Sequence, residues 1–403
     1  MYKLLRSDFI RKVIEIICAI LGLVNKYIPK NKNRILFFDS KEVYLNNYAM
    51  YRYMIENNLN KKYKIYYSMP GLKNTLDHTP KNVAFISGFL KTAIIYLTSS
   101  TVFLDTGNLR IKPSKNQEVL NLWHGTPLKR IGLCSKASGT TLPKNSLNAF
   151  SHVLVSSQNF INTFIQSFNL RENQVIIGGQ PRIDSLFNTN DTLKNLGIDK
   201  NNYHKIIMWM TTYRISYDNR LNHTSKSNWS KTNLPIITDM NEVRKLNDYL
   251  IDNNTLIIIK IHQGSKFTRE ELQSLSNILV IQDKDIIQKG LQLYEILAQC
   301  DALITDYSSV FFDFLLLDRP IGFIIDDIED YNEKNGFVFE NPLEYMPGKK
   351  IINFNQIFTF INEVIDEDDY YNSKRHIVNA YVNEYQDNLN CKRAFNFAIK
   401  KKV

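Results

Sequence analysis

Two series of short apolar segments, alternating with helical stretches, constrain the fold of this 403-residue chain more than any other feature. The first series predicts strands at residues 34–39, 63–67, 83–85, 101–105, 118–123, 149–156 and 175–178. The second predicts strands at residues 205–210, 256–261, 278–281, 302–305 and 320–325. Strands that alternate with helices favour parallel sheets covered on both faces. We therefore expect two doubly wound α/β domains with a cleft between them, in which ligands bind at the carboxyl ends of strands.

A polar stretch near residues 188–204 separates the two series and marks the predicted domain boundary. The expected parts are an N-terminal helix at residues 1–30, one Rossmann-like domain at 31–190, a second at 200–370, and helices at 371–403 that could pack back on the first domain.

The N-terminal helix is predicted from residues 13–24, VIEIICAILGLV, which are apolar apart from Glu15 and are flanked by lysines and arginines. A membrane-spanning helix needs about 20 apolar residues, and this segment is shorter. It also lacks a convincing signal-peptide cleavage site. We expect an amphipathic helix that lies on an anionic membrane surface. The alternative is an ordinary buried helix of the first domain.

The net charge of +10 favours an anionic partner, such as nucleic acid, a phosphorylated ligand or a membrane. Four widely spaced cysteines form neither a metal-site pattern nor a disulfide framework, and indicate reduced thiols in a cytosolic setting. No nucleic-acid-binding motif is present. The HExxH, GxxxxGKS and GxSxG motifs are also absent, which argues against a Walker-type ATPase and a serine hydrolase. We expect no metal and no cofactor.

The most informative motif is ITDYSSVFFDFLLLDRPIGF, residues 304–323. A predicted strand ends at Thr305 and Asp306, and Ser308 and Ser309 precede an apolar helix at about 310–317. Serines at a helix start can cap free backbone N–H groups, which is the structural alternative. The same N–H groups, with the helix dipole, can also receive a phosphate.

A second motif, LWHGTPLKRIG, places His124 directly after a predicted strand. Histidine has the pKa that a general base needs, and Gly125 allows a ligand to approach the backbone closely. Lys129 and Arg130 either hold phosphate charge or are simply solvated. The alternative is a purely structural histidine.

Three further segments are candidates for the same site. LIIIKIHQGS ends a strand at His262, which could face His124 from the second domain. GGQPRID supplies Arg182 and Asp184, and MTTYRIS supplies Thr212 and Arg214. Arginine suits bidentate contact with phosphate.

These motifs, in this order, resemble the CDP-glycerol glycerophosphotransferase family of teichoic-acid primases and polymerases, which has relatives in capsule synthesis. The resemblance covers about residues 34–347. It implies a GT-B fold, with an N-terminal acceptor domain and a C-terminal CDP-donor domain facing a central cleft. It also implies a peripheral protein at the cytoplasmic face of the cell membrane. The expected reaction transfers an alditol phosphate from CDP-glycerol or CDP-ribitol to a hydroxyl of a lipid-linked glycan, and releases CMP.

The family's functional residues map onto this chain position by position. His124 matches the histidine of the family's HGT motif, which looks like the catalytic base, and His262 matches a second histidine, which lies with the donor phosphates. The donor would also be bound by Thr212, Arg214, Thr305, Asp306, Ser308 and Ser309. Acceptor or supporting positions are Gly125, Thr126, Lys129, Arg182 and Asp184.

The chain departs from the family pattern at three places. Gln263 replaces a proline, TTYR replaces PTWR, and Asn335-Gly336-Phe337 replaces Arg-Gly-Phe, with Lys334 as the candidate to replace that arginine. These changes leave the alditol open. The alternatives are a ribitol-phosphate transferase, a GT-B glycosyltransferase that uses a nucleotide sugar, and a non-catalytic binding protein of envelope assembly.

Overall fold

The computed structural model describes residues 8–41, 45–69, 79–136, 147–188, 190–212, 234–260 and 275–400, with side chains from residue 12 onward. Contacts divide the chain into two compact units. Unit 1 comprises Met1–His124, Thr140–Asp184 and Asp387–Val403, and unit 2 comprises Gly125–Gly139 and Ser185–Gln386. The chain therefore passes from unit 1 to unit 2 directly after His124.

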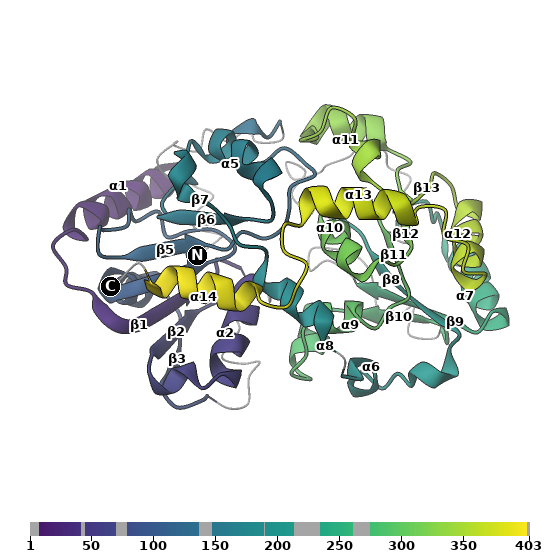
Figure 1. Cartoon of the computed structure of the whole chain (residues 1–403), viewed down its shortest axis with the longest axis horizontal. Coiled ribbons are helices and arrows are strands. Elements are labelled where there is room, and N and C mark those ends of the chain that lie inside the picture. Colours follow the sequence, from purple (N-terminus) through teal and green to yellow (C-terminus); the bar gives the residue numbers. More distant parts are fainter. Residues whose placement is uncertain are drawn as a thin grey trace. The chain divides into compact units, whose positions relative to one another are not determined.

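Unit 1 is built around a parallel sheet that has seven strands in the described residues, in the order β3-β2-β1-β4-β5-β6-β7 (Figure 1). The strands are β1 (Asn31–Phe38), β2 (Lys64–Ser68), β3 (Val83–Ile86), β4 (Ser99–Leu104), β5 (Glu118–Asn121), β6 (His152–Val155) and β7 (Val175–Ile177). From β1 the successive strands β2 and β3 are added toward one edge of the sheet, and from β4 the strands β5, β6 and β7 are added toward the other edge. The topological switch point therefore lies between β1 and β4. Ligands of doubly wound sheets bind at the carboxyl side of such a point.

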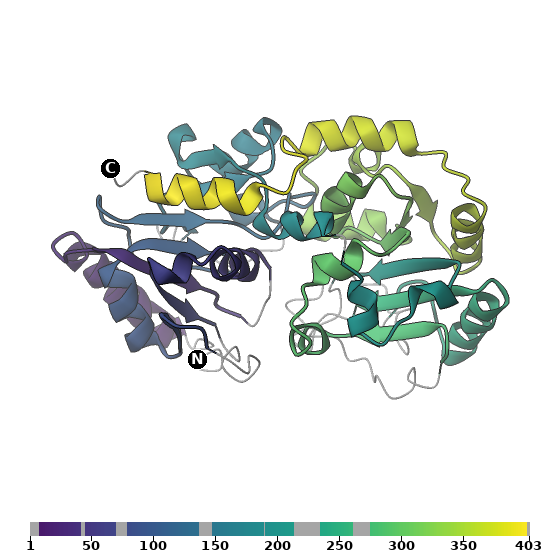
Figure 2. The same ribbon diagram turned by 60° about the horizontal axis from the view of Figure 1, so that its bottom comes forward.

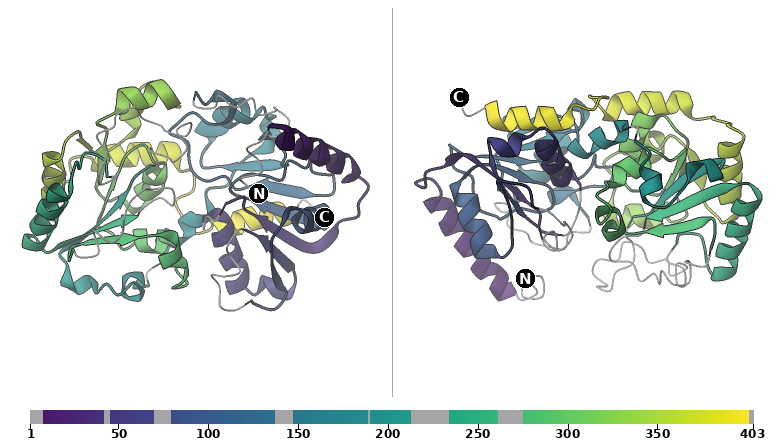
Figure 3. Two further views of the ribbon diagram at one scale, coloured as in Figure 1. Left: turned by 180° about the vertical axis from the view of Figure 1, so that it is seen from behind. Right: turned by 90° about the horizontal axis from the view of Figure 1, so that it is seen from below.

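Helices cover both faces of the unit 1 sheet. They are α1 (Asp8–Val24), α2 (Asn46–Glu56), α3 (Phe89–Thr98), α5 (Ile161–Phe168) and α14 (Asn390–Lys400), with short 3-10 turns at Leu59–Lys61, Gln158–Phe160, Glu172–Gln174 and Pro181–Phe187. Figures 2 and 3 show α1 and α3 on one face and α14 on the other. Both α1 and α3 bond to the loop after β4, through Cys18 Sγ to Leu109 O and Tyr96 Oη to Ile111 O.

Unit 2 contains a parallel sheet with six described strands, in the order β10-β9-β8-β11-β12-β13. They are β8 (Lys205–Met210), β9 (Thr255–Lys260), β10 (Ile278–Ile281), β11 (Ala302–Thr305), β12 (Ile321–Ile324) and β13 (Lys349–Ile351). The switch point of this sheet lies between β8 and β11.

The helices of unit 2 are α6 (Thr192–Asn195), α7 (Met240–Asp252), α8 (Asp283–Ile287), α9 (Leu293–Leu297), α10 (Val310–Phe314), α11 (Ile328–Asn335), α12 (Asn355–Ile365) and α13 (Asn372–Val382). Its 3-10 turns are Gly132–Cys134, Lys200–Asn202, Leu315–Leu317 and Pro342–Tyr345. One core lies where α7 and α12 pack on the sheet, and includes buried Trp209, Leu246, Ile257 and Phe360. Trp209 and Ile257 are strand residues that point to the face covered by these helices, because strand residues alternate between faces, and Leu246 and Phe360 pack there from α7 and α12.

The predicted fold class of two doubly wound α/β domains is confirmed. Each predicted strand overlaps an observed one, because strands buried on both faces form continuous apolar runs. The observed strand β13 had no predicted counterpart, because its sequence, KKI, contains two lysines. The predicted cleft stays a prediction.

The predicted N-terminal helix corresponds to α1. Its buried side consists of Cys18 and Gly22, and Glu15 pairs with Arg110 at 3.0 Å. No helix in the described ranges is long and apolar enough to cross a membrane.

A half-buried carboxylate fixes the C-terminal helix of unit 1. Asp184 accepts hydrogen bonds from the Asn390 backbone N–H (2.9 Å), the Asn390 side-chain amide (2.8 Å) and the Cys391 N–H (2.8 Å). Burial raises the pKa of Asp184. A Cβ at Gly179, whose φ is +72°, would lie 1.9 Å from Asn390 Oδ1, so glycine is required there. The GGQPRID segment thus has a structural role in holding α14.

We predict that Asp184→Ala lowers the free energy of unfolding by about 1–3 kcal/mol, because two buried backbone N–H groups of α14 lose their acceptor. Denaturant unfolding of purified protein measures this. Glu172→Ala, on an exposed turn of the same unit, is the matched control. An Asp184→Ala variant as stable as this control would contradict the assignment.

Candidate active site

Two buried carboxyl groups occupy the switch point of unit 1. Asp39 directly follows β1 and Asp105 directly follows β4, and each is 1% exposed. Asn47, near the start of α2, donates from Nδ2 to Asp39 Oδ1 (3.0 Å) and from its backbone N–H to Asp105 Oδ2 (3.3 Å). Tyr67 Oη donates to Asp39 Oδ2 at 3.0 Å. The two carboxyl groups are therefore held at the place where doubly wound sheets bind ligands.

Burial controls the protonation of this pair. It raises the pKa of Asp39 well above its usual range, and the charge of Asp105 raises it further. Burial also raises the pKa of Asp105 to about 7, although the Arg182 guanidinium opposes this shift. In the described residues, no group of three or more His, Cys, Asp or Glu side chains could hold a metal ion.

The turn that carries His124 is strained. Trp123 has a φ of +59°, a left-handed conformation that bulky residues rarely adopt. Its backbone N–H donates to Asn121 Oδ1 (2.9 Å), and its indole packs edge-on against Phe164 and Phe168. The imidazole of His124 lies 4.1 Å from the indole, centroid to centroid, and the residue is exposed.

Asn46 clamps this turn from the start of α2. Its side-chain amide donates to Trp123 O (2.6 Å) and to Gln180 Oε1 (2.8 Å), and its Oδ1 accepts from the Arg182 N–H (3.0 Å). Asn46 is completely buried. One side chain therefore links the HGT turn to the GGQPRID segment, and these two predicted motifs do come together.

The residues after His124 belong to unit 2. Gly125 (φ +139°) and Thr126 are buried. Lys129 forms an antiparallel bridge with Phe337, and the Val338 N–H donates to Leu128 O at 2.8 Å. The loop that follows the histidine is therefore paired with the segment after α11.

Arg130 lies against the Asn335-Gly336-Phe337 segment. Its backbone N–H donates to Gly336 O (3.0 Å) and its Nε to Phe337 O (3.1 Å). Lys334, the suggested replacement for the family's arginine, pairs instead with Asp330 at 3.7 Å. Arg130 is therefore the better placed of the two cations to supply positive charge at this segment.

In unit 2, Asp306 spans the switch point. Its carboxylate accepts from the Thr212 N–H (2.9 and 3.0 Å) and from Thr212 Oγ1 (2.8 Å). Thr305 Oγ1 donates to Met210 O at 2.6 Å. Asp306 and Thr305 are completely buried. The structure thus brings together Thr212, Thr305 and Asp306, and fixes the carboxyl ends of β8 and β11 relative to each other.

Two half-buried serines follow Asp306. Ser309 immediately precedes α10, yet its hydroxyl forms no capping hydrogen bond, so the capping role considered for it is not observed. The helix itself matches the prediction, since α10 continues into the 3-10 turn Leu315–Leu317. Asp313, in the apolar helix, accepts a hydrogen bond from Tyr294 Oη.

Two predicted site residues, Arg214 and His262, lie outside the described residues, and their roles stay predictions. The neighbouring Lys260 is described, and its Nζ pairs with Asp283 at 3.1 Å.

Sequence reasoning missed Asp39, Asn46 and Asp105. The two aspartates are the last residues of predicted strands, and a carboxylate at a strand end could have identified them as candidate site residues. Asn46 had no such signal, because its partners are 77 and 134 residues away.

The two sheets, each with polar side chains at its switch point, define the class of protein as a two-domain, GT-B-like α/β protein. The solved wall teichoic acid polymerase TagF has the same fold, with a TM-score of 0.76 at 21% identity over 98% of this chain and 96% of that chain. A putative UDP-N-acetylglucosamine 2-epimerase from Listeria monocytogenes is more distant, with a TM-score of 0.54 at 11% identity over 93% of this chain and 98% of that chain.

The chain belongs to the CDP-glycerol:poly(glycerophosphate) glycerophosphotransferase family, whose profile matches residues 21–400. It is 26% identical to the teichoic acid poly(glycerol phosphate) polymerase of Bacillus subtilis (strain 168), over 86% of this chain and 46% of that protein. It is 25% identical to the teichoic acid ribitol-phosphate polymerase TarL of Staphylococcus aureus (strain NCTC 8325 / PS 47), over 93% of this chain and 64% of that protein. The chain thus spans less than two thirds of either relative.

We predict that the stability conferred by the Asp105 carboxyl depends on pH. Its folded-state pKa of about 7 is above the ordinary 3.8, so folding favours the protonated form. This contribution is present below pH 3.8 and is lost as pH rises through about 7. The unfolding free energy of wild type, relative to Asp105→Asn, should therefore fall by up to about 1.4 kcal/mol per pH unit.

Denaturant unfolding at a series of pH values measures this difference. The same substitution at the exposed Asp252 controls for the loss of a carboxylate. A difference between wild type and Asp105→Asn that stays constant across the window would show that Asp105 is ionised in the folded protein.

Proposed function

We propose that this protein transfers an alditol phosphate, glycerol phosphate in the first instance, from a CDP-alditol to a hydroxyl of a lipid-linked glycan or polymer, and releases CMP. Membership of the glycerophosphotransferase family supports the reaction class. Relatives named for glycerol phosphate and for ribitol phosphate match almost equally well, so both CDP-alditols are candidate donors. The product would be a teichoic acid or a capsule-type polymer of the cell envelope.

The observation that carries this proposal is the exposed imidazole of His124 on a turn that the fold holds in a strained conformation. A general base must reach the proton that it removes, and must keep a fixed orientation. The Asn46 clamp and the contact with Trp123 supply that orientation.

In the proposed reaction, the acceptor oxygen attacks the β-phosphorus of the CDP-alditol. A new P–O bond forms to the acceptor, and the bond from the β-phosphorus to the bridging oxygen breaks. CMP leaves with that oxygen and with the bonding electron pair, while the acceptor proton passes to the imidazole of His124. Phosphoryl transfer depends mainly on placement and on charge stabilisation, so His124 is assigned only the removal of the acceptor proton.

The Asp306 turn is the proposed donor site. Because Asp306 already accepts three hydrogen bonds from Thr212, it serves to shape the turn. The hydroxyls and backbone N–H groups of Ser308 and Ser309 would bind the donor phosphates. His262 and Arg214 are proposed to balance the charge that develops on them.

We place the protein at the cytoplasmic face of the cell membrane as a peripheral protein. A lipid-linked acceptor requires access to the membrane, and the net charge of +10 favours an anionic surface.

Substrate panels test the reaction class. We expect CMP release from CDP-glycerol or CDP-ribitol with a synthetic lipid-linked acceptor, and no UDP release from UDP-sugars. UDP release alone would identify a nucleotide-sugar glycosyltransferase, and ligand binding without any turnover would identify a non-catalytic protein.

We predict that His124→Ala lowers the rate of CMP release about 10²–10⁴-fold, because a general base contributes about that much. Binding of the CDP-alditol, measured by calorimetry, should be unchanged. The matched control is His204→Ala, which removes an exposed imidazole in unit 2. Wild-type turnover by the His124 variant would refute its role as the base.

We predict that Asn46→Ala lowers kcat for CMP release about 10- to 100-fold, because misplacing the catalytic group costs about that much. KM for the CDP-alditol should change little, since the donor site is assigned to the Asp306 turn. Asn57→Ala, an exposed asparagine directly after the same helix, is the control. Equal kcat for the two variants would show that the clamp is not needed for catalysis.

A further inference from the structure

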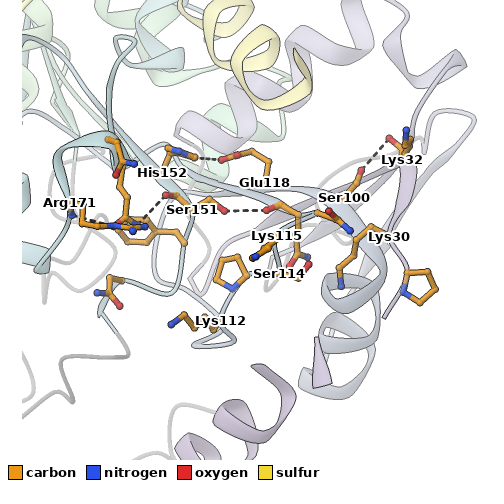
Figure 4. A pocket seen from close by; sticks show the side chains of 18 of the residues that line it. Lys30, Lys32, Ser100, Lys112, Ser114, Lys115, Glu118, Ser151, His152 and Arg171 are labelled. Carbon is orange, nitrogen blue, oxygen red and sulfur yellow. Dashed lines mark hydrogen bonds and ion pairs between the residues drawn. The ribbon is translucent and has the colours of Figure 1, made fainter. Parts of the chain in front are cut away.

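A cationic cavity lies in unit 1, at the edge of the sheet where strands begin (Figure 4). Its volume is about 1150 Å³. We call it the basic pocket, after five cationic side chains that line it, Lys30, Lys32, Lys112, Lys115 and Arg171.

The basic pocket is separate from the candidate active site. Its lining includes Lys32 and Ser100, near the starts of β1 and β4, and Glu118 and His152, the first residues of β5 and β6. His124 and Asp105 instead follow the carboxyl ends of β5 and β4. Strands of this length place the two edges roughly 13–20 Å apart, at about 3.3 Å per residue.

The charge of the basic pocket is largely uncompensated. Its one carboxylate, Glu118, is paired with His152 Nδ1 at 2.7 Å, as Figure 4 shows. Lys30 Nζ donates to Asn25 O and Oδ1 and to Leu97 O, and burial lowers its pKa to about 8. Within the described part of the chain, the remaining cations form no ion pair: Lys32, Lys112, Lys115 and Arg171.

Several unpaired cations around one cavity repel each other, and a multivalent anion removes this repulsion. Arginine and lysine together suit phosphate, since the guanidinium offers a planar fork and the ammonium a compact charge. The chemistry of the basic pocket therefore fits a phosphate group.

The basic pocket adjoins the end of α1. Asn25, directly after the helix, is completely buried, and its Nδ2 donates to Lys112 O and to Gln117 Oε1, both at 2.9 Å. Lys112 and Gln117 line the pocket. The first turn after α1 therefore supports the pocket wall.

The outer surface of α1 is apolar. Six of its large side chains are between 38 and 62% exposed: Val13, Ile16, Ile17, Ile20, Leu23 and Val24. Leu90 and Ile94 of α3 are exposed as well, and α3 bonds to the same loop as α1. A helix of a soluble protein normally buries its apolar stripe. An exposed apolar helix beside cations is typical of a surface that lies at the headgroup level of a membrane.

We propose that the basic pocket binds the phosphate of an anionic membrane lipid, while the exposed apolar side chains of α1 enter the adjacent acyl-chain boundary. The occupant is a lipid headgroup and not a soluble phosphate, because the pocket and the apolar surface share the turn at Asn25. This second phosphate site does not depend on the transfer reaction. It gives the membrane association a defined headgroup contact in place of diffuse charge attraction.

Vesicle co-sedimentation tests the proposal with the full-length protein. Wild type should bind vesicles of phosphatidylcholine mixed with phosphatidylglycerol, and bind phosphatidylcholine alone much more weakly. Lys112→Glu combined with Lys115→Glu should weaken binding to the mixed vesicles about tenfold or more, since each basic residue at a membrane contributes about 1 kcal/mol. The matched control is Lys245→Glu with Lys284→Glu, which makes the same charge change on exposed helices of unit 2.

Three results would overturn the proposal. Equal losses in the pocket and control variants would mean that only the overall charge matters. If the pocket variant no longer bound inorganic phosphate in calorimetry but still bound the mixed vesicles like wild type, the pocket would be assigned to a soluble phosphate. The third variant combines Ile16→Asp with Ile20→Asp, both at exposed positions. Vesicle binding equal to wild type by this variant would show that α1 does not enter the membrane. Unfolding temperatures verify that each variant is folded, and CMP release with a water-soluble acceptor separates this site from the transfer reaction.

Discussion

The hydrogen bond from the buried amide of Asn46 to the carbonyl oxygen of Trp123 is the contact on which the proposed chemistry depends. A non-glycine residue in the left-handed region costs about 1–3 kcal/mol, and persists only where its surroundings enforce it. Here the enforcing contacts are Asn46 on the carbonyl side, Asn121 on the N–H side and two phenylalanines around the indole. The result is that His124, the next residue, is exposed but held at a fixed place relative to the sheet.

Both units place carboxyl groups at their switch points, but with different chemistry. In unit 1, Asp39 and Asp105 are buried together. Burial raises the pKa of each carboxyl group, and the charge of Asp105 raises the pKa of Asp39 further. In unit 2, Asp306 stands between two strand ends and accepts both donors of Thr212. The first arrangement supports the turn around Arg182 and Asn46. The second shapes the serine turn before α10.

Much of the fold could be predicted from the sequence, because buried parallel strands are continuous apolar runs. The partners of site residues could not, because they are set by strand order and by distant segments. Asp184 resembled a functional residue in a motif, yet its carboxylate binds amides 206 and 207 positions later in the chain. The sequence left Arg130 open between a phosphate contact and a solvated cation, and could not show that it bonds to Phe337. The basic pocket collects lysines and an arginine from separate loops, each unremarkable alone.

The central claim is that the imidazole of His124 accepts the proton of the acceptor hydroxyl. The most direct measurement compares two titrations of the wild-type protein: the pH dependence of kcat/KM for CMP release, and the protonation of His124 followed by NMR. The account predicts that the acidic limb of the rate profile coincides with the His124 titration, because only the neutral imidazole can take the proton. A rate that remains constant while His124 becomes protonated would contradict it.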